Sequence, residues 1–73
     1  MQTTPVKLLD VVALLVDRPE EGLVVGQVGT VVEVFGPDVF EVEFLDSKGK
    51  TIAVTELKRS EVLVLKHEAA VAA

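Results

Sequence analysis

The sequence predicts an all-β domain, and three observations lead to this fold class. The chain has 73 residues, which allows a single domain with a small core. Sixteen of those residues are Val, a β-branched residue that favours strands over helices. Short apolar runs alternate with turn residues such as Gly, Pro and Asp along most of the chain. We therefore expect several short strands that close into a compact barrel or sandwich.

The first part of the chain predicts a lead-in, a strand and the start of a long loop. We interpret residues 1–9 as the lead-in and residues 10–17 as the strand. The spacing of the apolar residues in this run also permits a helix, but its valines favour a strand. Because both faces of the run are apolar, we expect both to be buried. Pro19 and Gly22 end the strand and open the loop.

The middle of the chain predicts two strands joined by a tight turn. Gly26 and Gly29 indicate a bulge or a close approach of two backbones before the second strand. That strand covers residues 30–35, and a Gly-Pro-Asp turn follows it. The third strand, residues 39–45, alternates cleanly between apolar and charged residues, as a half-buried strand does.

The last part of the chain predicts two more strands. Residues 46–50 form a hairpin turn in which Gly49 occupies the position that requires a positive φ. The fourth strand covers residues 51–57, and a tight turn leads to the fifth, residues 62–65. A long first loop, two tight hairpins and a one-turn link before the last strand together predict a five-stranded SH3-like small barrel.

These elements divide the chain into a barrel and a tail. The barrel covers residues 10–65, and residues 66–73 form an Ala-rich tail that we expect to be frayed and flexible.

The alternation of the strands also predicts their register and their faces. Pairing Phe35 with Val39 and Asp46 with Lys50 creates one apolar face, which we expect to point inward: Val32, Val34, Phe40, Val42, Phe44, Ile52 and Val54. The same pairing predicts an outer face that carries three acidic side chains among uncharged ones: Glu33, Glu41 and Glu43, with Val31, Phe35, Thr51, Ala53 and Thr55.

The charge of the chain excludes some classes of function. Twelve acidic residues against seven basic ones give a net charge of -5, which is unsuited to a protein that binds nucleic acid mainly through phosphates. The chain has no Cys for a disulfide or a thiolate-bound metal. Its apolar runs are too short to span a membrane, and its first residues do not resemble a signal peptide, so we expect a cytoplasmic protein.

The sequence gives little indication of a catalytic, metal or cofactor site, and we predict that the chain is not an enzyme and carries no cofactor. His67 is the only histidine, and it lies in the expected tail, away from the nearest hydroxyls, Thr55 and Ser60. The three outer glutamates could offer oxygens to a cation, but a flat strand face does not wrap one. The spacing of Gly22, Gly26 and Gly29 fits no phosphate-binding loop.

Two surfaces are candidates for binding. The acidic outer row complements a basic partner protein, and the residues that we assign to this site are Glu33, Glu41, Glu43, Val31 and Phe35. The chain also has more apolar residues than the inner face needs, which favours self-association as a homodimer or larger oligomer. We assign that contact to the first strand and the following loop: Leu14, Val16, Leu23, Val24 and Val25. The alternative is that the long first loop folds over and covers the surplus apolar residues: Leu8, Leu9, Leu14, Val16, Val24, Val25, Val31 and Phe35.

The order of the apolar segments resembles a family of short bacterial proteins, domain of unknown function 4926. The resemblance runs from about residue 7 to residue 65 and includes the segments 8–14, 26–34, 40–44 and 62–65. It implies an SH3-like barrel without an established activity, and some such proteins are suspected partners of a neighbouring toxin-like protein. Residues 26–34 are also similar to the KOW-type loop and strand of ribosomal and transcription proteins, although those loops are usually basic and this one is not.

The leading hypothesis for function is therefore a non-enzymatic protein-interaction module, such as the acidic antitoxin, immunity or accessory partner of a basic protein. The alternative is a KOW-like adaptor that binds RNA or a ribonucleoprotein. Its contact would be the basic cluster of two nearby turns, which carries no aromatic residue for base stacking: Lys48, Lys50, Lys58 and Arg59.

Overall fold

Five antiparallel strands form one sheet within residues 5–65, the part of the chain that the computed structural model describes. The strands are β1 (Val11–Leu14), β2 (Val28–Val34), β3 (Val39–Leu45), β4 (Thr51–Lys58) and β5 (Val62–Leu65). Two short 3-10 helices, η1 (Pro19–Glu21) and η2 (Arg59–Glu61), lie in the connections, and no helix in the described residues is long and apolar enough to cross a membrane. The all-β prediction is confirmed.

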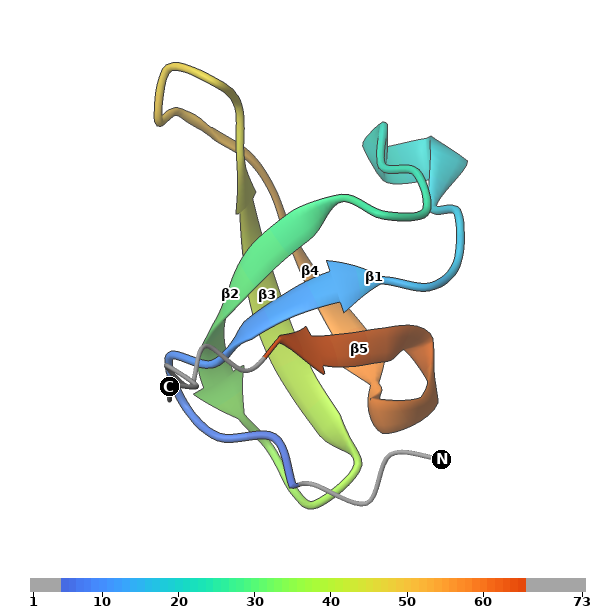
Figure 1. Ribbon diagram of the computed structural model, residues 1–73, viewed down its shortest axis with the longest axis vertical. Coiled ribbons are helices and arrows are strands. Elements are labelled where there is room, and N and C mark those ends of the chain that lie inside the picture. Colours follow the sequence, from blue (N-terminus) through green and yellow to red (C-terminus); the bar gives the residue numbers. More distant parts are fainter. Residues whose placement is uncertain (1–4, 66–73) are drawn as a thin grey trace, which may run out of the picture.

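The strands lie in the order β4-β3-β2-β1-β5 (Figure 1). The first four strands form a meander, and β5 returns to pair with β1, which is the connectivity that the predicted small barrel requires. The expected positions of the third and fifth strands are those observed. The hairpin turn of β3 and β4 extends beyond the other strands (Figure 1), and Gly49 in this turn has the predicted positive φ, 83°.

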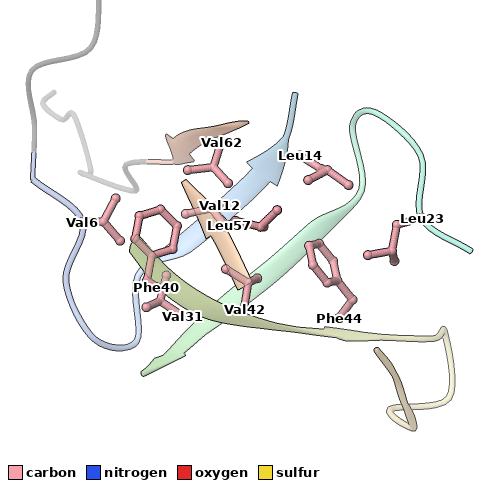
Figure 2. Close-up of a cluster of buried hydrophobic side chains, with 10 residues drawn as sticks. All are labelled: Val6, Val12, Leu14, Leu23, Val31, Phe40, Val42, Phe44, Leu57 and Val62. Carbon is pink, nitrogen blue, oxygen red and sulfur yellow. The ribbon is translucent and has the colours of Figure 1, made fainter. Parts of the chain in front are cut away.

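The core lies on the inner face of the sheet and consists of ten buried apolar side chains (Figure 2). Leu23 from the long loop lies with Phe44 at one end, and Val6 lies with Phe40 at the other (Figure 2). Val6 belongs to the segment that the sequence suggested was a lead-in, so this segment also contributes to the core. The remaining members are Val12, Leu14, Val31, Val42, Leu57 and Val62.

β1 is shorter than the predicted strand and is buried on one face only. Val12 and Leu14 are fully buried, whereas Val11 and Ala13 are half-buried and Leu15 is exposed. The expectation of two buried faces is wrong because, within residues 5–65, the core covers only one side of the sheet, and the outer residues of β1 lie between the neighbouring strands, β2 and β5.

A β-bulge in β2 corrects the predicted register of the first hairpin. Near the turn the pairing is as predicted, with Glu33 opposite Glu41 and Val34 opposite Phe40. The register then shifts, so that Val31 instead of Val32 lies opposite Val42. A shift of one residue moves side chains to the other face. Val31 is therefore buried and Val32 is exposed, contrary to the prediction. Val34 keeps its predicted partner but is also exposed, at the end of β2.

A second bulge, at the start of β4, corrects the other hairpin. The turn is as predicted, with the Asp46 amide donating to the Lys50 carbonyl at 2.8 Å. Leu45 then pairs with Thr51 while Phe44 pairs with Ala53, which leaves Ile52 as the extra residue. Ile52 and Val54 are consequently exposed instead of buried. Ala53 and Thr55 take their places opposite Phe44 and Val42, and Leu57 lies opposite Phe40 in the core.

The long loop between β1 and β2 closes over one end of the inner face. The Arg18 guanidinium donates to the Glu56 carbonyl of β4 at 2.6 Å, and the Thr55 hydroxyl donates to the Glu21 carboxylate at 2.8 Å. These two bonds hold η1 against β4 and place Leu23 on the core. Gly22, with a φ of 73°, ends η1 in the left-handed conformation that glycine adopts without strain.

Candidate protein-interaction surface

Three glutamates lie side by side on the outer face of the sheet. Glu41 in β3 is the cross-strand partner of Glu33 in β2 and of Glu56 in β4. Residues paired in this way point to the same face with Cβ atoms about 4.5–5.5 Å apart. We call these three residues the glutamate row. Glu33 and Glu56 are exposed, and the central Glu41 is half-buried.

The glutamate row carries concentrated negative charge. Within residues 5–65, none of the three carboxylates has an ion pair, and the ion pair found there joins Arg18 to Glu21. Like charges directly opposite one another on neighbouring strands destabilise a sheet. The row therefore costs folding free energy in the isolated chain, and a cationic surface placed along it would remove this cost.

Glu43 belongs to the neighbouring row of the same face. Its cross-strand partners are Thr30 and Val54, and its carboxylate accepts a hydrogen bond from the Thr51 hydroxyl at 2.5 Å. The outer side of β3 thus presents two carboxylates in succession, Glu41 and Glu43, but only Glu43 has a hydrogen-bond donor within the hairpin.

An exposed aromatic side chain flanks the glutamate row. Phe35 exposes 55% of its surface next to the end of β2, and its amide donates to the Val39 carbonyl of β3 at 2.9 Å. On the other side of the row, Val54 is about half exposed. Aromatic side chains are frequent centres of binding energy in protein interfaces, so acidic and apolar groups occur together on this face.

The structure keeps four of the five predicted partner-binding residues on or beside this face. Glu33, Glu41 and Glu43 lie on the outer side of the sheet, and Phe35 is exposed directly after the end of β2. Val31 was wrongly expected there, because the bulge in β2 turns it into the core. That these residues bind a partner remains a prediction.

Glu56 is the member of the site that the sequence analysis missed. An unbroken register from Asp46 and Lys50 would have placed Glu56 opposite Phe40, inside the core. Burying a carboxylate without a partner costs several kcal/mol, so this conflict was a signal that the register must shift. In the structure Leu57 lies opposite Phe40, and Glu56 is exposed.

The predicted self-association site is not a continuous surface. Leu14 and Leu23 are buried in the core of their own chain, and Val16 packs against this core. The loop reaches the core through Leu23, but it does not cover most of the surplus apolar residues, so the alternative interpretation is also wrong for the larger part of them: Leu8, Leu9, Val24, Val25 and Phe35 are exposed. Val24 and Val25 remain exposed, and the Val25 amide donates to the Asp17 carboxylate at 3.0 Å. The assignment of Leu14 and Leu23 to an intermolecular contact is therefore wrong.

The other candidate sites gain no support from the geometry. The two basic turns are not neighbours, because Lys50 directly precedes β4 and Lys58 is its last residue, which places them about 25 Å apart at the rise of an extended strand. Within residues 5–65, no group of three or more acidic, His or Cys residues is arranged to hold a metal ion. His67 and the predicted tail, residues 66–73, lie outside the described residues.

Comparison with known proteins gives a family but no function. The model of the family described as "Domain of unknown function (DUF4926)" matches residues 8–64, which extend from before β1 into β5. The predicted resemblance to this family is confirmed. No curated protein and no solved structure is detectably similar to the chain.

Proposed function

We propose that this chain, which belongs to the DUF4926 family, is a non-enzymatic protein-interaction module that binds a basic partner through its glutamate row. The observation that carries the proposal is the in-register alignment of Glu33, Glu41 and Glu56 across three neighbouring strands. Among the described residues, no cation is paired with this alignment.

The energetics of the row favour a basic partner. In the free chain the carboxylates repel one another, and a partner's Lys or Arg side chains would replace this repulsion with attraction. Electrostatic complementarity of this kind speeds association and selects among partners. Affinity would come mainly from the apolar groups beside the row, with the half-exposed ring of Phe35 as the aromatic anchor.

Within this class of function, a neutralising or accessory subunit is the role that we favour. A small acidic domain that covers a basic surface can block that surface, and an antitoxin or immunity protein of a basic toxin could act in this way. The net charge of -5 gives the whole chain the same sign as its binding row, so long-range attraction would guide the encounter.

A charge reversal at the centre of the row tests the proposal. In Glu41→Lys, the new ammonium lies between Glu33 and Glu56 and pairs with them, so the variant should remain folded. Glu20→Lys is the matched control, because Glu20 lies in η1, is exposed and makes the same change in net charge. Each tagged protein would be incubated with extract of its native host, and the captured proteins would be quantified by mass spectrometry.

We expect the wild type and Glu20→Lys to retain the same basic protein in stoichiometric amount and Glu41→Lys to retain about tenfold less of it. Raising the salt concentration should release the partner from the wild type, since exposed charges are screened within about 10 Å at 0.1 M salt. Equal capture by Glu41→Lys and the wild type, or the absence of a captured basic protein, would contradict the proposal.

A further inference from the structure

A band of exposed or half-buried apolar side chains crosses the outer face next to Glu43. Leu63, Ala13 and Val28 are consecutive cross-strand partners in β5, β1 and β2. Because Gly29 pairs with Phe44, the next residues, Val28 and Leu45, are neighbours, and Ile52 and Val54 continue the band on β4. We call Leu63, Ala13, Val28, Leu45, Ile52 and Val54 the apolar band.

The apolar band is unusual for a surface that remains in water. Its five large members each expose between 40% and 50% of their surface. Monomeric proteins rarely expose contiguous apolar patches larger than a few hundred Å² unless the patch binds something. The two β-bulges create the β2 and β4 parts of this surface, because they turn Val31 and Leu57 inward and leave Val28, Ile52 and Val54 outward.

The charges on either side of the apolar band have opposite signs. Toward one end of the β3–β4 hairpin, the outer face carries Glu43 and then Glu41. Toward the other end, the turn carries Lys48 and Lys50. The Asp46 carboxylate in this turn accepts hydrogen bonds from the amides of both lysines, at 2.8 and 2.9 Å, so it is held against the backbone of the turn. Along the hairpin the order is therefore acidic, apolar, basic.

We propose that the occupant of the apolar band is a second copy of this chain, related to the first by a two-fold axis. If the β3–β4 hairpins of the two copies lie antiparallel, their apolar bands contact each other at the centre of the interface. The lysines of each copy then lie opposite Glu41 and Glu43 of the other copy. An interface between identical patches must be self-complementary, and the acidic-apolar-basic order fulfils this condition only in the antiparallel arrangement. A parallel arrangement would oppose like charges at both ends.

This dimer has a consequence that rests on the proposed function. It covers Glu41 with the lysines of the second copy, so a basic partner and a second copy exclude one another. The free chain would then be stored as a dimer whose binding row is occupied, and the partner would bind the dissociated form.

The test is the dimer dissociation constant of the full chain, measured by sedimentation equilibrium at low salt. We expect a dimer for the wild type and for Glu20→Lys. Glu41→Lys alone, and Lys48→Glu/Lys50→Glu alone, should each raise the dissociation constant at least about tenfold. The proposal is overturned if the wild type is a monomer, or if the dimer is unaffected by both charge reversals.

Mixing the two variants gives a stronger test, which a loss of folding cannot imitate. A heterodimer of Glu41→Lys with Lys48→Glu/Lys50→Glu contains one junction in which both sides are wild type. Native mass spectrometry should therefore detect the heterodimer at concentrations at which neither variant forms a homodimer. If no heterodimer forms, the proposed pairing is wrong.

The outcomes separate this inference from the proposed function. Capture of a basic protein that depends on Glu41, together with a monomeric wild type, overturns the dimer and leaves the proposed function intact. A dimer that depends on these charges, without a captured basic partner, supports the dimer and contradicts the proposed function.

Discussion

The two faces of β3 differ in what they contribute to the molecule. Its inner residues, Phe40, Val42 and Phe44, are fully buried and touch the rest of the core. Its outer residues, Glu41, Glu43 and Leu45, carry unneutralised charge and half-exposed apolar surface. From this comparison we expect the inner face to provide the stability of the fold and the repulsion on the outer face to lower the stability of the isolated chain. Substitutions at neighbouring positions of one strand should therefore separate stability from binding.

Removing an aromatic ring from the inner face should have the largest effect. Phe44→Ala deletes a fully buried side chain at the end of the core where Leu23 closes the loop, and we expect a loss of about 3–5 kcal/mol in the free energy of unfolding. The neighbouring outer change, Leu45→Ala, should cost less than about 1 kcal/mol, because Leu45 is half exposed. Urea denaturation at concentrations that keep the chain monomeric measures both. Equal losses would show that the two faces do not differ as described.

Adding a single methyl group to the inner face tests the same comparison from the other direction. A Cβ at position 29 would lie 2.6 Å from Val42 Cγ1 and 2.8 Å from the Glu43 carbonyl oxygen, so β2 and β3 would have to move apart. We expect Gly29→Ala to lower the free energy of unfolding by about 1–3 kcal/mol. In Gly36→Ala the new Cβ meets nothing within 4 Å, so its effect should stay within about 0.5 kcal/mol. If the Gly29→Ala variant is as stable as the wild type, then β2 and β3 are not packed as closely at Gly29 as described.

The contrast between the faces also explains which parts of the fold the sequence could predict. Turns and strand ends have local signals, so the turn at Gly49 and the bounds of β3 and β5 were predicted correctly. Alternation within a strand failed where both sets of residues are apolar. In β4, both alternating sets of residues contain apolar side chains: Ile52 and Val54 belong to one set, and Leu57 belongs to the other together with Thr55. Only the position of the charged residue Glu56 decides which set faces the core.

The positions of the two bulges depend on contacts between neighbouring strands, so the sequence of one strand alone does not reveal them. In β2, the shift places Val31 instead of Val32 opposite Val42 and Gly29 instead of Thr30 opposite Phe44, where a side chain would clash. In β4, the shift removes Glu56 from the core and aligns it with Glu41. The acidic character of the site was therefore predictable from Glu33 and Glu41. Its third member was not, because it depends on the position of a bulge.

The smallest predicted effect concerns the outer face, and it has the opposite sign. Replacing the central carboxylate of the glutamate row removes repulsion toward Glu33 and Glu56, so Glu41→Gln should raise the free energy of unfolding by a few tenths of a kcal/mol. Glu41→Lys replaces repulsion with two attractions and should stabilise the chain by up to about 1 kcal/mol. Thermal unfolding of the monomer at low salt measures both changes.

Salt provides the control for this last prediction. Screening weakens repulsion in the wild type and attraction in Glu41→Lys, so raising the ionic strength should bring the stabilities of the two proteins closer together. Glu20 lies outside the row, so the difference in stability between Glu20→Lys and the wild type should not shrink in this way when salt is added. If Glu41→Gln is instead destabilising at low salt, the carboxylate must be held by a favourable contact. The row would then be a stabilising part of the fold, and its cost in the free chain would no longer be an argument for a basic partner.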